Sequence, residues 1–120
     1  MAGMDEDDVR RLALALPLVT ERQSWGMPAW FHHHLVARMW DAERVTVKVE
    51  DDGERRALAE QEPGVFTTTD HHAGTNLILV TLAAVDESTL AALLAESWWW
   101  AAPPTWRRKY PELGPPGQAS

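Results

Sequence analysis

The stretch HHLVARMWDAERVTVKVE, residues 33–50, contains two alternating segments separated by three residues that include two acids. Alternation with a period of two predicts β-strands over 33–40 and 44–50, and the segment 41–43 suits a tight hairpin loop. If Trp40 lies opposite Arg44, the apolar sides of both strands fall on one face. The sequence therefore predicts an antiparallel hairpin with one buried face and one outward face.

The inward face of this hairpin is predicted to carry Leu35, Ala37, Met39, Val45, Val47 and Val49. The outward face is predicted to carry His34, Val36, Arg38, Trp40, Arg44, Thr46 and Lys48. An outward tryptophan between two arginines suits the stacking of a base or another aromatic ring, with cation–π support. The alternative is that Trp40 only pairs across the strand with a guanidinium.

Outside the hairpin, helices are expected over residues 5–16, about 52–61 and about 86–101. Asp5, Asp51 or Asp52, and Asp86 stand where an N-cap is needed. Further strands are expected over 28–32, 65–68 and 76–82, whereas 20–24 is interpreted as a turn-like connection. The order α-β-β-β-α-β-β-α indicates one mixed domain over residues 1–113, followed by a Pro/Gly-rich tail, 114–120, expected to be disordered.

Composition excludes several classes of protein. The chain has no cysteine, and no apolar run approaches the roughly 20 residues that span a bilayer. Its acidic start does not resemble a signal peptide, so we expect a cytoplasmic protein without membrane contact. The net charge of −7 weighs against nonspecific nucleic-acid binding, which normally comes with a basic surface.

Seven of the ten aromatic residues are tryptophan. At about 100° per residue, Trp98 and Trp100 flank the apolar stripe of the last helix, and Trp99 lies opposite it. Trp99 is therefore expected under the C-terminal residues or in a dimer contact, with exposure to a ligand as the alternative. Trp25 and Trp30, at the entry to the first predicted strand, are interpreted first as packing residues and second as ligand contacts.

No pattern in the sequence indicates catalysis. A Gly-rich phosphate loop, a nucleophile elbow and a His-Glu-x-x-His motif are all missing. His32 and His34 could share one side of a strand near His71 and His72, but structural or surface histidines are the expectation. We therefore expect no catalytic residue, no metal ligand and no cofactor, and a protein that is not an enzyme.

Several segments occur in an order similar to that of a known family. They are Leu16-Pro17, Thr20-Glu21, Trp25-Gly26-Met27-Pro28-Ala29-Trp30, Arg38-Met39-Trp40, Val45–Val49 with Lys48, Glu62–Phe66, and the His-x-x-Gly loop His71–Gly74. Over about residues 5–112 the chain thus resembles the MmcQ/YjbR family of small bacterial proteins. The resemblance implies a two-layer α+β fold of the double-wing type, with helices on one antiparallel five-stranded sheet, and a DNA-binding role.

Three functions remain open at this point. The first is a non-catalytic DNA-binding or regulatory protein that uses two basic clusters, namely Arg38, Trp40, Arg44 and Lys48 together with Arg107, Arg108 and Lys109. The second is binding of a planar aromatic metabolite or drug, as sequestration or self-resistance, since the family takes part of its name from a member of an antibiotic gene cluster. Its expected contacts are Trp25, Trp30, His34, Arg38, Trp40, His72 and Trp99. The third is a homodimer formed through exposed aromatic residues.

Overall fold

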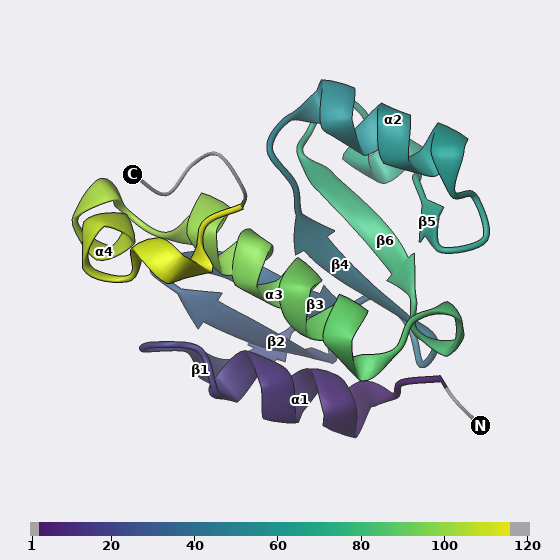
Figure 1. Ribbon diagram of the computed structural model, residues 1–120. Coiled ribbons are helices and arrows are strands. Elements are labelled where there is room, and N and C mark those ends of the chain that lie inside the picture. The colour runs from purple at the N-terminus through teal and green to yellow at the C-terminus, as the bar shows by residue number, and fades with distance from the viewer. Residues whose placement is uncertain (1–2, 116–120) are drawn as a thin grey trace.

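A single antiparallel sheet of six strands organises the chain, in the order β1-β2-β3-β4-β6-β5 (Figure 1). The computed structural model describes residues 3–115. The strands are β1 (Thr20–Ser24), β2 (Met27–His32), β3 (His34–Met39), β4 (Arg44–Lys48), β5 (Phe66–Thr67) and β6 (Leu77–Thr81). Every neighbouring pair runs antiparallel.

Different helices pack against different strands of the sheet. The α-helices are α1 (Glu6–Leu14), α2 (Asp52–Gln61), α3 (Glu87–Ala101) and α4 (Pro104–Lys109), and the short 3₁₀ turns are η1 (Asp70–His72), η2 (Leu82–Ala84) and η3 (Pro111–Leu113). Helix α3 packs against β3 and β4 with α1 beside it, whereas α2 contacts β5 and β6 (Figure 1). The predicted α+β class is confirmed. No helix within residues 3–115 is both long enough and apolar enough to cross a membrane.

The predicted helix starts are confirmed by their caps. The side chain of Asp5 accepts the backbone N–H of Asp8, whose own carboxylate accepts from the Asp5 N–H in return. At α2 and α3 the bond runs one way only: Asp51 accepts the backbone N–H of Glu54, and Asp86 accepts that of Thr89. Each cap satisfies one of the backbone donors that a helix start leaves without a partner, which explains why the sequence located these ends well.

The sequence analysis missed one strand. Residues 20–24, expected to form a turn, are the edge strand β1, so the sheet has six strands rather than the five expected. Four of the five residues of β1 are exposed, and the segment is entirely polar. An edge strand with no buried side lacks the apolar alternation by which a strand is recognised. Helix α4 was also not expected, because Pro103 and Pro104 indicated only where α3 stops.

The hairpin register is confirmed, but β3 carries a bulge. Arg38 lies opposite Thr46, and the Trp40 N–H donates to the Arg44 carbonyl at 2.9 Å. On the other side of β3, Leu35 and Ala37 pair with consecutive residues of β2, so Val36 is an extra residue. A bulge of this kind reverses the alternation beyond it. Leu35, predicted inward, instead shares the outward face with Arg38 and Trp40.

The bulge is tied to α3 by one buried hydroxyl. Ser97 is fully buried; its Oγ donates to the carbonyl of Val36 and accepts the backbone N–H of Lys48 at 2.9 Å. The serine thus supplies a hydrogen-bond partner to both backbone groups. Val36, predicted on the outward face, is therefore buried at the bulge.

Three tryptophans form part of the core. Trp30 and Trp98 are fully buried, and their indole N–H groups donate to Glu21 Oε1 and to the Pro17 carbonyl, each at 2.9 Å. Trp99 is 6% exposed and lies against Gly114, where an added Cβ would meet its ring at 3.1 Å. The expectation that Trp99 packs under the C-terminal residues is confirmed. The part of the predicted disordered tail from residue 116 onward lies outside the described residues.

Replacing Ser97 by alanine tests the bridge between α3 and the bulge. Ser97→Ala leaves the Val36 carbonyl and the Lys48 N–H buried without a partner, so the free energy of unfolding should fall by about 1–3 kcal/mol for each group. Urea unfolding measures this loss. Ser88→Ala, at an exposed position of the same helix, should change stability by less than about 0.5 kcal/mol. An unchanged midpoint for Ser97→Ala would show that the bridge contributes nothing.

Candidate functional site

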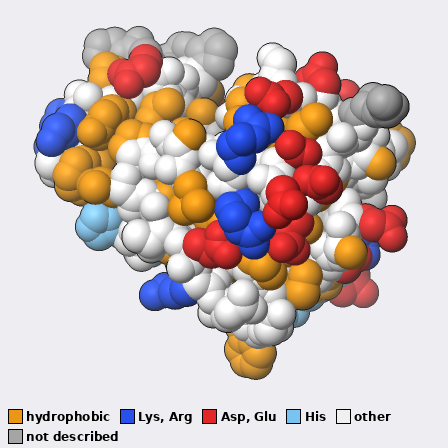
Figure 2. Space-filling model, turned by 90° about the horizontal axis from the view of Figure 1, so that it is seen from below, with side chains coloured by type: hydrophobic (Ala, Val, Ile, Leu, Met, Phe, Trp, Pro, Cys, Tyr) orange, Lys and Arg blue, Asp and Glu red, His pale blue; other side chains and the backbone are white. Residues whose placement is uncertain are grey.

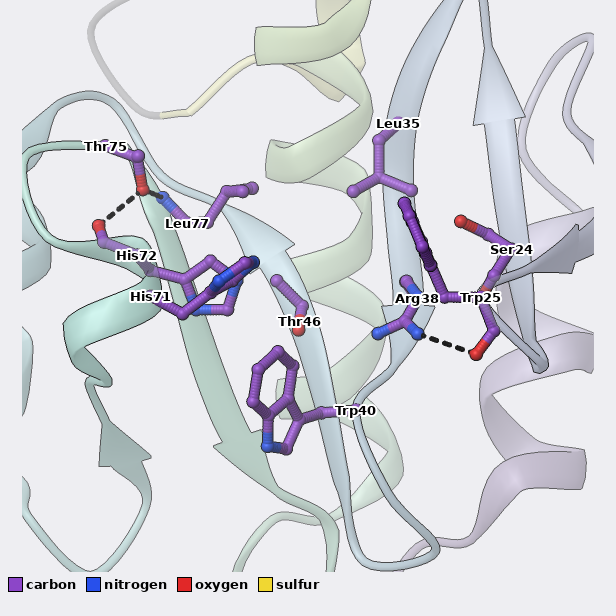
Figure 3. A pocket seen from close by; sticks show the side chains of 10 residues that line it. All are labelled: Ser24, Trp25, Leu35, Arg38, Trp40, Thr46, His71, His72, Thr75 and Leu77. Carbon is purple, nitrogen blue, oxygen red and sulfur yellow. Dashed lines mark hydrogen bonds between the residues drawn. The ribbon is translucent and has the colours of Figure 1, made fainter.

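The sheet face opposite α3 carries a groove of about 610 Å³ (Figure 3). Ala37 and Met39 are fully buried on the side that α3 covers, and the residues between and beyond them alternate to the other side. The groove is lined by Ser24, Trp25, Leu35, Arg38, Trp40, Thr46, His71, His72, Thr75 and Leu77. Segments far apart in the chain therefore meet on this face.

The central strands form the floor of the groove. Arg38 and Thr46 are register partners on β3 and β4, and Trp40 lies at the end of the same hairpin. Leu35 joins them only because of the bulge at Val36. Thr46 is 2% exposed, and its hydroxyl oxygen has no hydrogen-bond partner among the described residues.

One wall of the groove is the 3₁₀ turn η1. Thr69 caps η1, and its hydroxyl lies 3.0 Å from His72 Nδ1, which fixes the orientation of that ring. The Trp40 ring packs edge-on against His72, with the centroids 5.1 Å apart, and His71 lies 5.8 Å from Trp40. Burial lowers the pKa of His72, and the nearby charges of His71, Arg55 and Arg38 lower it further. The neutral imidazole is thus favoured at neutral pH.

The opposite wall is the turn between β1 and β2. Trp25 and Gly26 form a two-residue hairpin loop and both have positive φ, 54° and 81°. Such a turn favours Asn-Gly, and a bulky residue at its first position is strained. Arg38 holds the turn in place, because its Nε donates to the Ser24 carbonyl at 2.9 Å and its Nη2 to the Trp25 carbonyl at 3.4 Å. Trp25 is 93% exposed.

Other predicted contact residues lie elsewhere. Trp30 and Trp99, expected to contact an aromatic ligand, are core residues, and His34 is exposed outside the groove. Arg44 is paired with Asp41 at 2.6 Å. Burial lowers the pKa of the Lys48 amine, whose side chain does not line the groove. Of the hairpin residues predicted as a site, the groove gathers only Arg38 and Trp40.

The second predicted basic cluster, on α4, does not join the first. Within residues 3–115, no side chain of α4 lines the groove. Arg107 Nε donates to the Trp99 carbonyl at 2.8 Å, and its guanidinium lies over Trp99 and Trp100. Lys109 lies over Trp106, 5.0 Å from the ring centroid, while Arg108 is exposed.

The possible His-x-His arrangement along one strand does not form. His33 has φ 58° and links β2 directly to β3, so His32 and His34 lie across a tight turn rather than along one strand. His32 is 1% exposed and packs edge-on against Trp98 and Trp106. It is a core residue, and burial lowers its pKa.

Four of the contacts predicted for an aromatic ligand do line the groove, namely Trp25, Arg38, Trp40 and His72. Sequence reasoning missed His71, and it interpreted Trp25 first as a packing residue because β1 was not recognised. With β1 in place, the Trp-Gly dipeptide between two paired strands would have marked an exposed turn. No pattern in the sequence around residues 70–72 indicated that η1 would lie beside β4 and β6.

A family model described as YjbR matches residues 14–100, more than half of the chain. The chain belongs to the YjbR family. This confirms the resemblance to MmcQ/YjbR proteins that the ordered sequence segments indicated. The match covers the sheet, the groove residues and all of α3 except Ala101, whereas α4 and nearly all of α1 lie outside it.

The structure of this YjbR protein is similar to the crystal structure of Deinococcus radiodurans protein DR2400, whose domain is described as DUF419. The two chains share 20% identity over 95% of this chain and 94% of the other, with a TM-score of 0.69. At that identity the likeness shows a common fold. A search of curated proteins found no match.

The strained turn gives a stability test within this YjbR chain. Trp25→Asn places a residue that tolerates positive φ before Gly26, so we expect the free energy of unfolding to rise by up to about 1 kcal/mol. Thermal or urea unfolding measures the change. Trp25→Ala lacks the side-chain amide with which asparagine stabilises a positive φ, and it should bring little gain. A clear loss of stability in Trp25→Asn would show that the indole itself supports the fold.

Proposed function

We propose that the protein is a non-catalytic binding protein that takes a small planar aromatic molecule in the groove between Trp25 and η1. The volume of about 610 Å³ lies within the roughly 300–1,000 Å³ range of small-molecule sites. The lining fits the same class of ligand, because most of its accessible surface is apolar, although six of the ten lining side chains are those of Ser, Thr, Arg or His.

The observation that carries this proposal is the exposed indole of Trp25. It is 93% exposed, stands on a strained turn, and contributes its ring to the groove rather than to the core (Figure 3). Strain held at a fixed position is a feature of ligand-binding sites. Trp40 lies on the floor between Trp25 and the histidines of η1, so a flat ring bound there would contact aromatic faces on more than one side.

A groove for a small molecule has more support than a DNA-binding surface. Duplex binding needs several cations free to contact phosphates. Arg44 is paired with Asp41, Lys48 is half-buried, and Arg107 is bonded to the Trp99 carbonyl. On the α1 face, basic side chains lie among acidic ones (Figure 2), and Arg10 and Arg11 are both ion-paired.

Calorimetric titration with 1-naphthamide, a neutral planar aromatic probe, tests the proposal. We expect saturable binding that weakens about three- to tenfold in Trp25→Ala and in Trp40→Ala, because each variant removes a stacking surface. Trp106→Phe, which alters a tryptophan outside the groove, is the control and should bind the probe as the parent does.

Two results would contradict this function. One is the absence of saturable binding by the unmodified protein at millimolar probe. The other is equal loss of affinity in Trp106→Phe, which would place the site elsewhere. A labelled duplex at low salt addresses the DNA alternative: binding that is lost in Arg38→Ala and weakens steeply with salt would favour it.

A further inference from the structure

The groove differs in charge from the rest of the molecule. The chain contains 18 Asp and Glu residues against 11 Lys and Arg, yet none of the ten residues that line the groove is acidic. The one permanently charged side chain among them is Arg38. In this acidic protein, the lining of the groove therefore carries no carboxylate.

Arg38 is not neutralised by a protein carboxylate. Within residues 3–115, its hydrogen bonds go to the backbone carbonyls of Ser24 and Trp25, and it takes part in no salt bridge. Arg44 and Arg55, by contrast, are paired with Asp41 and Asp52. A guanidinium has five N–H donors, so Arg38 keeps both its charge and further donors for a ligand.

A second donor lies beside it with no partner. The Thr46 hydroxyl is buried, lines the groove and has no hydrogen bond among the described residues, and Thr46 is the register partner of Arg38. A buried hydroxyl without a partner is unfavourable until an acceptor reaches it. Burial is the largest cause of the lowered pKa of His72, and the smaller contributions of Arg55 and Arg38 agree with a positive potential at this end of the groove.

We infer that the ligand is a planar aromatic carboxylate, with its ring against Trp25 and Trp40 and its carboxylate oxygens accepting from Arg38 and the Thr46 hydroxyl. The inference rests on the proposed function and adds the charge of the ligand. A carboxylate matches the planar donor set of a guanidinium, and charge-assisted hydrogen bonds of this kind are stronger than neutral ones. A cation in the same place would face Arg38 without any compensating acid.

Three probes with the same ring separate charge from stacking: 1-naphthoate, 1-naphthamide and 1-naphthylmethylammonium. At neutral pH and low salt, calorimetry should show naphthoate bound about tenfold or more tightly than the amide, and the ammonium most weakly. Added salt should reduce the preference for naphthoate and leave the affinity for the amide unchanged.

Variants at Arg38 and Thr46 show which side chain is responsible for the tighter binding of naphthoate. Arg38→Gln should abolish the difference between naphthoate and naphthamide, Arg38→Lys should keep part of it, and Thr46→Val should weaken naphthoate more than the ammonium. Arg22→Gln is the matched control, because Arg22 lies over Phe31 at 3.9 Å and outside the groove. If Arg38 only held the Trp25 turn, Arg38→Gln would weaken all three probes equally.

The outcomes distinguish this inference from the proposed function. Equal binding of the three probes, still dependent on Trp25 and Trp40, would overturn the carboxylate assignment and leave the aromatic site in place. Tightest binding of the ammonium would overturn it as well. Binding of none of the probes would count against both.

Discussion

The hydroxyl of Ser97 is the contact on which the arrangement of the sheet depends. It joins the middle of α3 to the bulge at Val36 and to the backbone of Lys48 at the end of β4. Without a partner for the Val36 carbonyl, the bulge would leave a buried acceptor unsatisfied. Because Ser97 supplies that partner, the bulge can reverse the alternation of β3, and the Leu35 side chain lies on the face that carries Arg38. A helix on one side of the sheet thereby sets the composition of the groove on the other.

The tryptophans serve different purposes despite being one residue type. Trp30 and Trp98 combine burial with a hydrogen bond from the indole N–H, the combination that makes a buried tryptophan favourable. Trp25 contributes almost no buried area and stands on a strained turn. Trp40 is intermediate, half-buried and packed against His72. Burial therefore distinguishes core residues from candidate binding residues where composition does not.

The basic residues, like the tryptophans, differ from one another in their structural roles. Two basic side chains that the sequence suggested as DNA contacts instead make contacts within the fold. Arg44 pairs with Asp41 across the hairpin loop, and Arg107 of α4 donates to the Trp99 carbonyl near the end of α3. Arg38 also has a structural role, but its partners are backbone carbonyls, so its positive charge is not neutralised by a carboxylate. Membership of the YjbR family places the chain among related proteins, while the environment of Arg38 is what supports one class of ligand over another.

The sequence by itself determined the features that depend on neighbours in the chain. These are the helix starts at Asp5, at Asp51 or Asp52, and at Asp86, together with the register of the hairpin around residues 41–43. A cap or a short loop is satisfied within a few residues of the chain. The tertiary structure alone decided the position of β1, the bulge at Val36 and the groove. An edge strand without a buried face has no apolar pattern, and a bulge within a run of apolar residues leaves no local mark. The groove exists only because η1 and the Trp25 turn, nearly fifty residues apart, pack over the same strands.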